Sequence, residues 1–312
     1  MVASSQHILR RRTAGNNVWL GYPESSSRDN LATLIPRKLS YEVLESEAAV
    51  GRAMFDEIER AAQAKSDDLV IILLGGRGAQ ALHRLLGAAA QTDEKDELLG
   101  RLHVFTQDAL APMRVDNAFS FVRDFERLLG PDFFRKIKSF TSMRTDAEDL
   151  EQELARYVER LGALGGIDIF FLGLGPEANA ASHLAYIKPG SGATYQDVAG
   201  VIPVSTSILE HHIAKFKAGG SPVSEKDEAE CRRATHILTL GPAAILGARR
   251  IVQSIVDAST APGKRESYAR LLQTEISSDL EERARQLDEN PGLWLRLQPN
   301  TRSLILSDVL EG

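Results

Sequence analysis

Residues 167–172 form an almost wholly apolar run of strand length, which ends in the glycine turn Gly173-Leu174-Gly175. A strand without alternating polar residues is typical of a parallel sheet that is buried on both faces. Ligands bind to such sheets just beyond the carboxyl ends of their strands. Glu177 and Asn179 follow this turn directly, so we predict a ligand site at this point.

The same strand–turn–helix pattern recurs along the chain. Its apolar periods predict strands at 39–44, 69–74, 102–106, 167–172, 235–240 and 251–256, extended segments at 293–297 and 303–306, an edge strand at 200–204, and helices at 47–64, 79–90, 119–129, 146–164 and 243–250. This order predicts an α/β fold in which a mostly parallel, doubly wound sheet carries helices on both faces. We expect a single domain of modified Rossmann type over 38–312, preceded by an arm or loop over 1–37.

Charge and composition restrict the partners. The net charge is −6 and there is no long basic block, so a nucleic-acid partner is not expected. The short basic run 10–12 is interpreted as a solvated tail. No apolar stretch reaches the roughly 20 residues that cross a bilayer, and the start lacks the apolar core of a signal peptide. With Cys231 as its only cysteine, the chain is expected in a reducing compartment, the cytoplasm. The sequence leaves a homo-oligomer possible.

The loop 75–80, Gly-Gly-Arg-Gly-Ala-Gln, lies between a buried strand and a helix. Gly75, Gly76 and Gly78 allow a ligand to approach the backbone, and the helix that follows presents free N–H groups to an anion. Arg77 adds a permanent positive charge that suits a phosphate or a carboxylate. The alternative is a tight turn with an exposed arginine.

Two other side chains are candidates for catalysis. Asp108 follows the strand 102–106 and suits a general base or a sugar-hydroxyl ligand, or else caps the next segment. His183 is four residues after Asn179 and shares its face if a helix begins there; otherwise it is an ordinary surface histidine.

No cofactor or metal is expected. Gly173-x-Gly175-x-x-Ala178 matches the dinucleotide fingerprint formally, but Asp197, at roughly the right distance, precedes a strand instead of ending one. Adjacent His211 and His212 point in different directions on a helix, and no other cluster has metal-ligand spacing.

Taken together, these segments resemble the glucosamine-6-phosphate deaminase and 6-phosphogluconolactonase superfamily in order and spacing over about residues 38–308. The loop 75–82 lies where the superfamily has its Gly-Gly-Ser/Thr phosphate loop, and Asp108 lies where it has a catalytic aspartate. The segment 173–182 is similar to its Gly-x-Gly-x-Asp-Gly-His-x-Ala motif, which places Gly175 in the binding loop. Lys264 resembles its late phosphate-binding lysine. The resemblance implies that the partner is an anionic sugar or sugar phosphate.

The chain also departs from this pattern. The motif's aspartate is Glu177 and its histidine is Asn179, whereas Arg77 lies near the place of the phosphate-binding Ser or Thr. Asn179 cannot exchange a proton near neutral pH, although it can orient a hydroxyl or a water. General acid–base help is worth roughly 100- to 10,000-fold, so standard deamination is expected to be crippled unless His183 replaces the missing histidine.

Two interpretations follow. The first is an enzyme of carbohydrate metabolism, an isomerase/deaminase acting on a glucosamine-6-phosphate type of sugar, with Asp108, Glu177, Asn179 and His183 as its catalytic positions. A lactonase-like hydrolase is an alternative within this class. The second is a catalytically silent protein that binds a sugar phosphate with the same fold.

Overall fold

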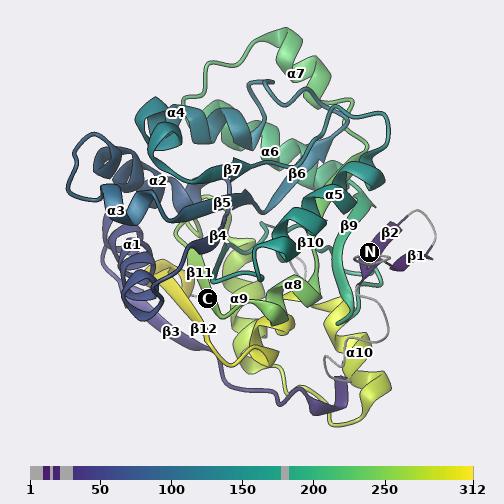
Figure 1. The fold of residues 1–312 in the computed structure, drawn as a ribbon. Coiled ribbons are helices and arrows are strands. Elements are labelled where there is room, and N and C mark those ends of the chain that lie inside the picture. Colours follow the sequence, from purple (N-terminus) through teal and green to yellow (C-terminus); the bar gives the residue numbers. More distant parts are fainter. Residues whose placement is uncertain (1–9, 15–16, 22–30, 177–182, 312) are drawn as a thin grey trace, which may run out of the picture.

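A sheet of seven parallel strands forms the centre of the computed structural model, which describes residues 10–14, 17–21, 31–176 and 183–311 (Figure 1). Every neighbouring pair of strands in this sheet is parallel. The order is β3 (Ser40–Leu44), β12 (Thr301–Leu306), β11 (Arg250–Ile255), β8 (Ile169–Leu172), β4 (Leu69–Leu73), β5 (Leu102–Thr106) and β7 (Ser139–Thr141). The predicted α/β class is confirmed.

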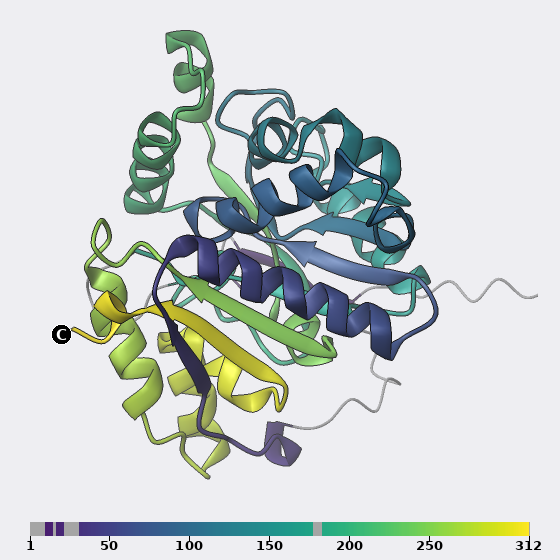
Figure 2. The same ribbon diagram turned by 90° about the vertical axis from the view of Figure 1, so that its left-hand side faces the viewer.

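Different layers cover the two faces of this sheet. Ile71 and Phe171 point to one face and pack with the apolar side chains of helices α1 (Glu47–Ala64), α2 (Arg77–Ala90) and α4 (Phe121–Lys136). Figure 2 shows α1 lying across this face. Val70 and Phe170 point to the opposite face and pack with α5 (Leu150–Ala163), α9 (Gly263–Gln273) and a second sheet. Burial on both faces explains why these strands are continuously apolar.

The second sheet is antiparallel in the part that the structure describes. Its order is β1 (Arg10–Ala14), β2 (Asn17–Gly21), β9 (Asp197–Pro203), β10 (His236–Leu240) and β6 (Asp108–Ala111). The prediction of an edge strand at 200–204 is wrong, because β9 lies between β2 and β10. Pro203 is tolerated there because β2 pairs with β9 only as far as Val201, so β9 is an edge on that side at Pro203. The strand predicted at 235–240 is β10 and belongs to this second sheet. Its apolar run indicates that the strand is buried but does not indicate which strand it pairs with.

Strands β1 and β2 pair with each other antiparallel, where the sequence predicts an arm or loop. Trp19 is fully buried, and its indole Nε1 donates a hydrogen bond to the carbonyl oxygen of Ser191 at 3.1 Å. Arg12 pairs with Asp197 at 2.5 Å, so the prediction that this basic run is a solvated tail is wrong for Arg12. Two five-residue strands are too short to show a clear period. The domain boundary at residue 37 stays a prediction.

Some predicted elements differ in length or type. The helix predicted at 119–129 is α4, which begins after Ser120, whose hydroxyl caps the amide of Val122, and continues to Lys136 across a break at Gly130. The segment 293–297, predicted as extended, lies in a buried 3-10 helix, Pro291–Leu297. The remaining described helices are α3 (Asp96–Leu99), α6 (Thr206–Ala218), α7 (Glu225–Cys231), α8 (Pro242–Gly247), α10 (Leu280–Glu289) and the 3-10 turns Leu31–Thr33 and Ser307–Val309. None of the described helices combines the length and apolar character that crossing a membrane requires.

Candidate functional site

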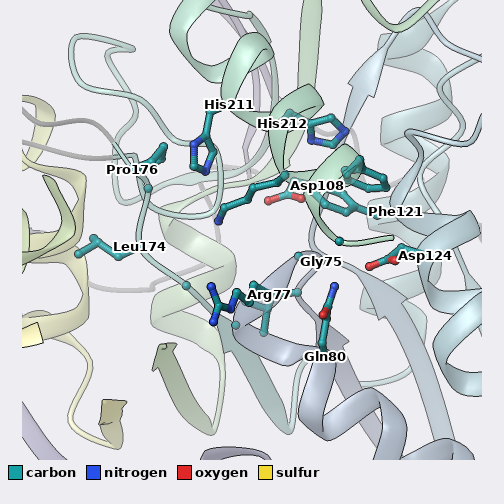
Figure 3. A pocket seen from close by; sticks show the side chains of 18 of the residues that line it. Gly75, Arg77, Gln80, Asp108, Phe121, Asp124, Leu174, Pro176, His211 and His212 are labelled. Atoms are coloured by element: carbon teal, nitrogen blue, oxygen red, sulfur yellow. The ribbon is translucent and has the colours of Figure 1, made fainter. Parts of the chain in front are cut away.

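A cavity of about 560 Å³ opens where the carboxyl ends of β4, β5, β8 and β11 meet (Figure 3). This is the position that the strand-end rule predicts for a ligand. Eight predicted site residues line it: Gly75, Gly76, Arg77, Gly78, Asp108, Gly175, His183 and Lys264. The other two, Glu177 and Asn179, lie outside the described residues, so the roles assigned to them stay predictions.

The glycine turn at 75–78 forms part of the cavity wall, and the fold itself also requires glycine at two of its positions. A Cβ atom on Gly75 would lie 2.1 Å from the Phe121 ring, so this ring packs directly on the loop. Gly76 has a φ of 77°, a conformation that favours glycine. Gly76 also precedes the first turn of α2, and no side chain caps that end of the helix. The amide of Ala79 donates to the carbonyl oxygen of Gly76 at 3.2 Å, so an anion at the cavity would be bound by the N–H groups that precede it in this turn.

Arg77 lines the cavity, but its guanidinium already has a partner. Nε of Arg77 donates to Oε1 of Glu47 at 3.0 Å, and a second nitrogen approaches the same oxygen at 2.5 Å. The hydrogen bond to Glu47 raises the pKa of Arg77 further. A bound anion would thus compete with the Glu47 carboxylate, which weakens the net attraction that Arg77 offers.

Asp108 is the buried carboxyl of the site. It begins β6 directly after β5, is 6% exposed, and accepts a hydrogen bond from Nε2 of Gln107 at 2.9 Å. Burial raises the pKa of this carboxyl to about 8, although the Gln107 hydrogen bond acts in the opposite direction. A group with this pKa gains and loses a proton close to neutral pH, as a general acid–base catalyst must. The alternative, that Asp108 caps the next segment, does not fit, because Asp108 and the residues after it form the strand β6 and not a helix.

A group of charges that the sequence analysis recognised only in part lies at the other side of the cavity. Asp257 is almost fully buried and accepts from Nζ of Lys215 at 2.6 Å and from Nζ of Lys264 at 2.5 Å. Burial alone would raise the pKa of Asp257, but the two ammonium groups hold it well below its usual range. Two cations share one carboxylate, so this cluster carries one positive charge that has no counter-charge within it.

The histidines occupy different environments. His211 reaches toward the cavity from α6 (Figure 3), and its Nε2 is buried without a hydrogen-bond partner in the described part of the chain. Burial, with a smaller effect of Lys215, lowers the pKa of His211 to about 3, so its ring is neutral. His212 belongs to the core, where its Nε2 contacts the carbonyl oxygen of Phe119 at 2.7 Å.

His183 lines the same cavity and is 7% exposed, with its ring centroid 4.9 Å from that of Tyr186. The interpretation of His183 as a surface histidine is therefore wrong. Residue 183 itself is not helical, so the spacing argument that connects it to Asn179 does not apply. Its burial beside the cavity is what keeps it as a candidate.

Sequence reasoning missed Lys215, Asp257 and the pocket-facing role of His211. Asp257 follows the end of β11 by two residues, so the strand-end rule could have found it. Lys215 lies in the last turn of α6, where a lysine is common on any helix. No set of three or more potential metal ligands occurs among the described residues.

Comparison with known proteins shows which sequences and folds this chain resembles. No family model matches the chain. Short matches occur to curated glucosamine-6-phosphate deaminases: 41% identity over 56 residues with the protein of Parabacteroides distasonis, and 28% over 142 residues with that of Bacillus pumilus. These matches cover 18% and 46% of this chain, and they span only 19% and 50% of the two relatives.

Solved structures are similar over nearly the whole chain. A monomeric glucosamine-6-phosphate deaminase has a TM-score of 0.65 and 20% identity, covering 88% of this chain and 99% of its own. The 6-phosphogluconolactonase of Trypanosoma cruzi has a TM-score of 0.64 and 16% identity, covering 90% and 98%. At such low identity the likeness establishes the fold, and the fold that the sequence resemblance implies is confirmed.

Proposed function

We propose that this chain, which has the fold of the glucosamine-6-phosphate deaminase and 6-phosphogluconolactonase superfamily, binds an aminosugar phosphate and transfers a proton on its carbon skeleton through Asp108. The observation that supports this most is the placement of Asp108. A buried carboxyl with a pKa of about 8 faces the same cavity as a cluster with an excess positive charge. The carboxyl of Asp108 suits a proton transfer, and the positively charged cluster suits a phosphate.

The cluster formed by Lys215, Asp257 and Lys264 supports the phosphate end of the proposal. Burial lowers the pKa of Lys264 to about 8, which still leaves most of this amine protonated at pH 7. A phosphate would supply the missing negative charge in a site from which water is largely removed, where charge–charge attraction is strong. The N–H groups at the start of α2 line the same cavity and would add hydrogen bonds to the anion.

Asp108 supports isomerisation with deamination over lactone hydrolysis. In an open-chain aminosugar a base removes the proton from C2 and the same group can return it to C1, while a second proton passes from the ammonium group to the aldehyde oxygen O1. This leaves a C=N bond at C2, which water hydrolyses with release of ammonia. One carboxyl that both accepts and donates suffices for this transfer, and a pKa of about 8 suits both roles near neutral pH. Lactone hydrolysis needs a base that activates water, for which His183 is the described candidate.

A silent binding protein is the second candidate, and one observation favours it. Asn179 stands where the superfamily motif has a histidine, and an amide cannot move a proton during ring opening. In this case the cavity would bind the sugar phosphate without turning it over.

The direct test measures ammonia release from glucosamine 6-phosphate, and in parallel acid release from 6-phosphogluconolactone. We expect ammonia release by the native chain, a loss of at least 100-fold in Asp108→Asn, and no loss in the control Asp132→Asn, which alters a partly exposed carboxyl on α4 that pairs with Arg135. Lactone hydrolysis alone would reject the deaminase proposal. Tight sugar-phosphate binding without either product would favour the silent protein.

A gain-of-function variant separates a weak enzyme from a silent one. Asn179→His restores a titratable ring, so we expect it to raise ammonia release if the cavity presents the substrate to Asp108 correctly. A folded Asn179→His protein that binds glucosamine 6-phosphate and releases no more ammonia than the native chain would count against the proposal.

A further inference from the structure

The strand β3 is the outermost strand of the parallel sheet (Figure 2). In the described part of the chain it pairs with β12 alone, and no backbone hydrogen bond joins Ser40–Leu44 to a segment outside the sheet. Its outer edge therefore presents unpaired N–H and C=O groups. Such an edge is a template for pairing with another strand unless charged residues or proline protect it.

This edge exposes apolar side chains between the charged residues at its two ends. Six large apolar side chains are exposed among the described residues, and three of them lie within nine positions here: Ile35, Tyr41 and Val43, at 69%, 46% and 45%. The Glu42 carboxylate is engaged by Arg302 of the neighbouring strand β12 and is not free to repel a partner. The edge thus combines unpaired backbone with a concentration of exposed apolar surface.

We propose that β3 pairs antiparallel with β3 of a second copy of this chain, with Tyr41 of both copies on the twofold axis. A twofold axis perpendicular to a sheet keeps each side chain on its own face, and residues opposite each other in an antiparallel pair share a face. Positions i and 82 − i then face each other. Tyr41 faces Tyr41, and Leu39 faces Val43 of the second copy.

Charge complementarity just outside β3 favours this register. Arg37 and Glu45 lie at the two ends of the segment, both exposed, and neither has an ion-pair partner among the described residues. With the axis at Tyr41, each Arg37 faces Glu45 of the second copy, once at each end of the pair. An axis at Glu42 would place two carboxylates opposite each other, and an axis at Ser40 would place Arg37 opposite Val43. Of these three registers, the one at Tyr41 places Arg37 opposite Glu45 and Leu39 opposite Val43, while Lys38 lies opposite Leu44.

Cysteine cross-linking tests the register. Residues facing each other across an antiparallel pair have Cα atoms about 4.5–5.5 Å apart, within the range that a disulfide bridges. Tyr41→Cys is therefore expected to form a covalent dimer on oxidation. In Val43→Cys the two cysteines are offset by four residues, roughly 13 Å, and should cross-link at least about tenfold less. Cys231, the native cysteine, is fully buried. Equal cross-linking of both variants, or none with Tyr41→Cys, would overturn the register.

Charge exchange tests the pairing itself, with sedimentation equilibrium as the readout. We expect the native chain to dimerise, and Arg37→Glu or Glu45→Arg alone to raise the dimer dissociation constant at least tenfold, because like charges then face each other. The double variant restores opposite charges and should return to near the native value. Tyr41→Lys places two like charges on the twofold axis and should also raise the dimer dissociation constant. Leu280→Lys, at an exposed leucine of α10, is its matched control and should leave dimerisation unchanged.

A native chain that stays monomeric at high concentration, or a dimer that is insensitive to both single exchanges, would contradict the proposal. None of these measurements uses catalytic activity, so they can fail independently of the proposed function.

Discussion

Replacing Asp108 by asparagine is expected to stabilise the protein at alkaline pH while removing its proposed activity. The carboxyl is nearly inaccessible, and its described side-chain hydrogen bond comes from Nε2 of Gln107 at 2.9 Å. Asparagine has nearly the same shape and can present its own carbonyl oxygen to that donor. The variant therefore removes a buried titratable group without opening a cavity.

The magnitude follows from the pKa of Asp108. In the unfolded chain this carboxyl titrates near its ordinary value of 3.8, and burial raises its folded pKa to about 8. Between these values the folded state keeps the proton and the unfolded state releases it, so the free energy of unfolding falls as pH rises. The slope is about 1.4 kcal/mol per pH unit, which gives a loss of about 4 kcal/mol between pH 5 and pH 8.

Urea unfolding of the native chain and of Asp108→Asn at pH 5, 6.5 and 8 measures this loss. The difference in unfolding free energy should grow in favour of the variant by about 4 kcal/mol over this range, and Asp132→Asn should show no such growth. Parallel pH profiles for the native chain and Asp108→Asn would refute the reasoning, because they would mean that Asp108 is ionised in the folded state at pH 5.

Other expected outcomes address the core and the cavity. Burial lowers the pKa of His83 to about 3, and its ring nitrogens have no hydrogen-bond partner in the described structure. As pH falls, His83 is protonated in the unfolded chain before it is protonated in the folded chain, so the free energy of unfolding of the native chain should fall by about 2 kcal/mol between pH 6.5 and pH 5. In urea unfolding, His83→Leu should remove this fall. An unchanged acid profile would contradict this. Gly75→Ala should cost roughly 1–3 kcal/mol by overpacking, and Phe121→Leu should relieve part of that cost in a double-mutant cycle; simple additivity would exclude the contact. Glu47→Gln should release Arg77 and tighten phosphate binding several-fold in calorimetry, whereas an unchanged affinity would mean that Arg77 does not reach the anion.

Local sequence pattern predicts the parallel sheet and the position of the cavity, because both depend on short segments. A buried strand such as 69–73 shows its apolar run, and a strand-end turn shows its glycines. The five-stranded antiparallel sheet is different. β6, β9 and β10 come from distant parts of the chain, and an apolar run does not specify which strand it pairs with. The pairing of β1 with β2 is not predicted either, because five-residue strands carry too little period.

The residues of the candidate site likewise differ in whether the sequence predicts them. Asp108 and Lys264 were found from a strand end and from the superfamily resemblance. Lys215 could not be found, because a lysine in the last turn of a helix has many ordinary explanations and its pairing with Asp257 spans 42 positions. The charge excess of this cluster becomes apparent only when α6, β11 and α9 are assembled.

The central claim, that the cavity binds a sugar through its phosphate, is tested most directly by calorimetry with glucosamine 6-phosphate and with glucosamine. We predict saturable binding of the phosphorylated sugar, at least tenfold weaker binding of glucosamine, and a loss of that preference in Lys264→Met, because this variant removes the excess positive charge. Equal affinity of the native chain for the two sugars, or no binding of glucosamine 6-phosphate, would contradict the account.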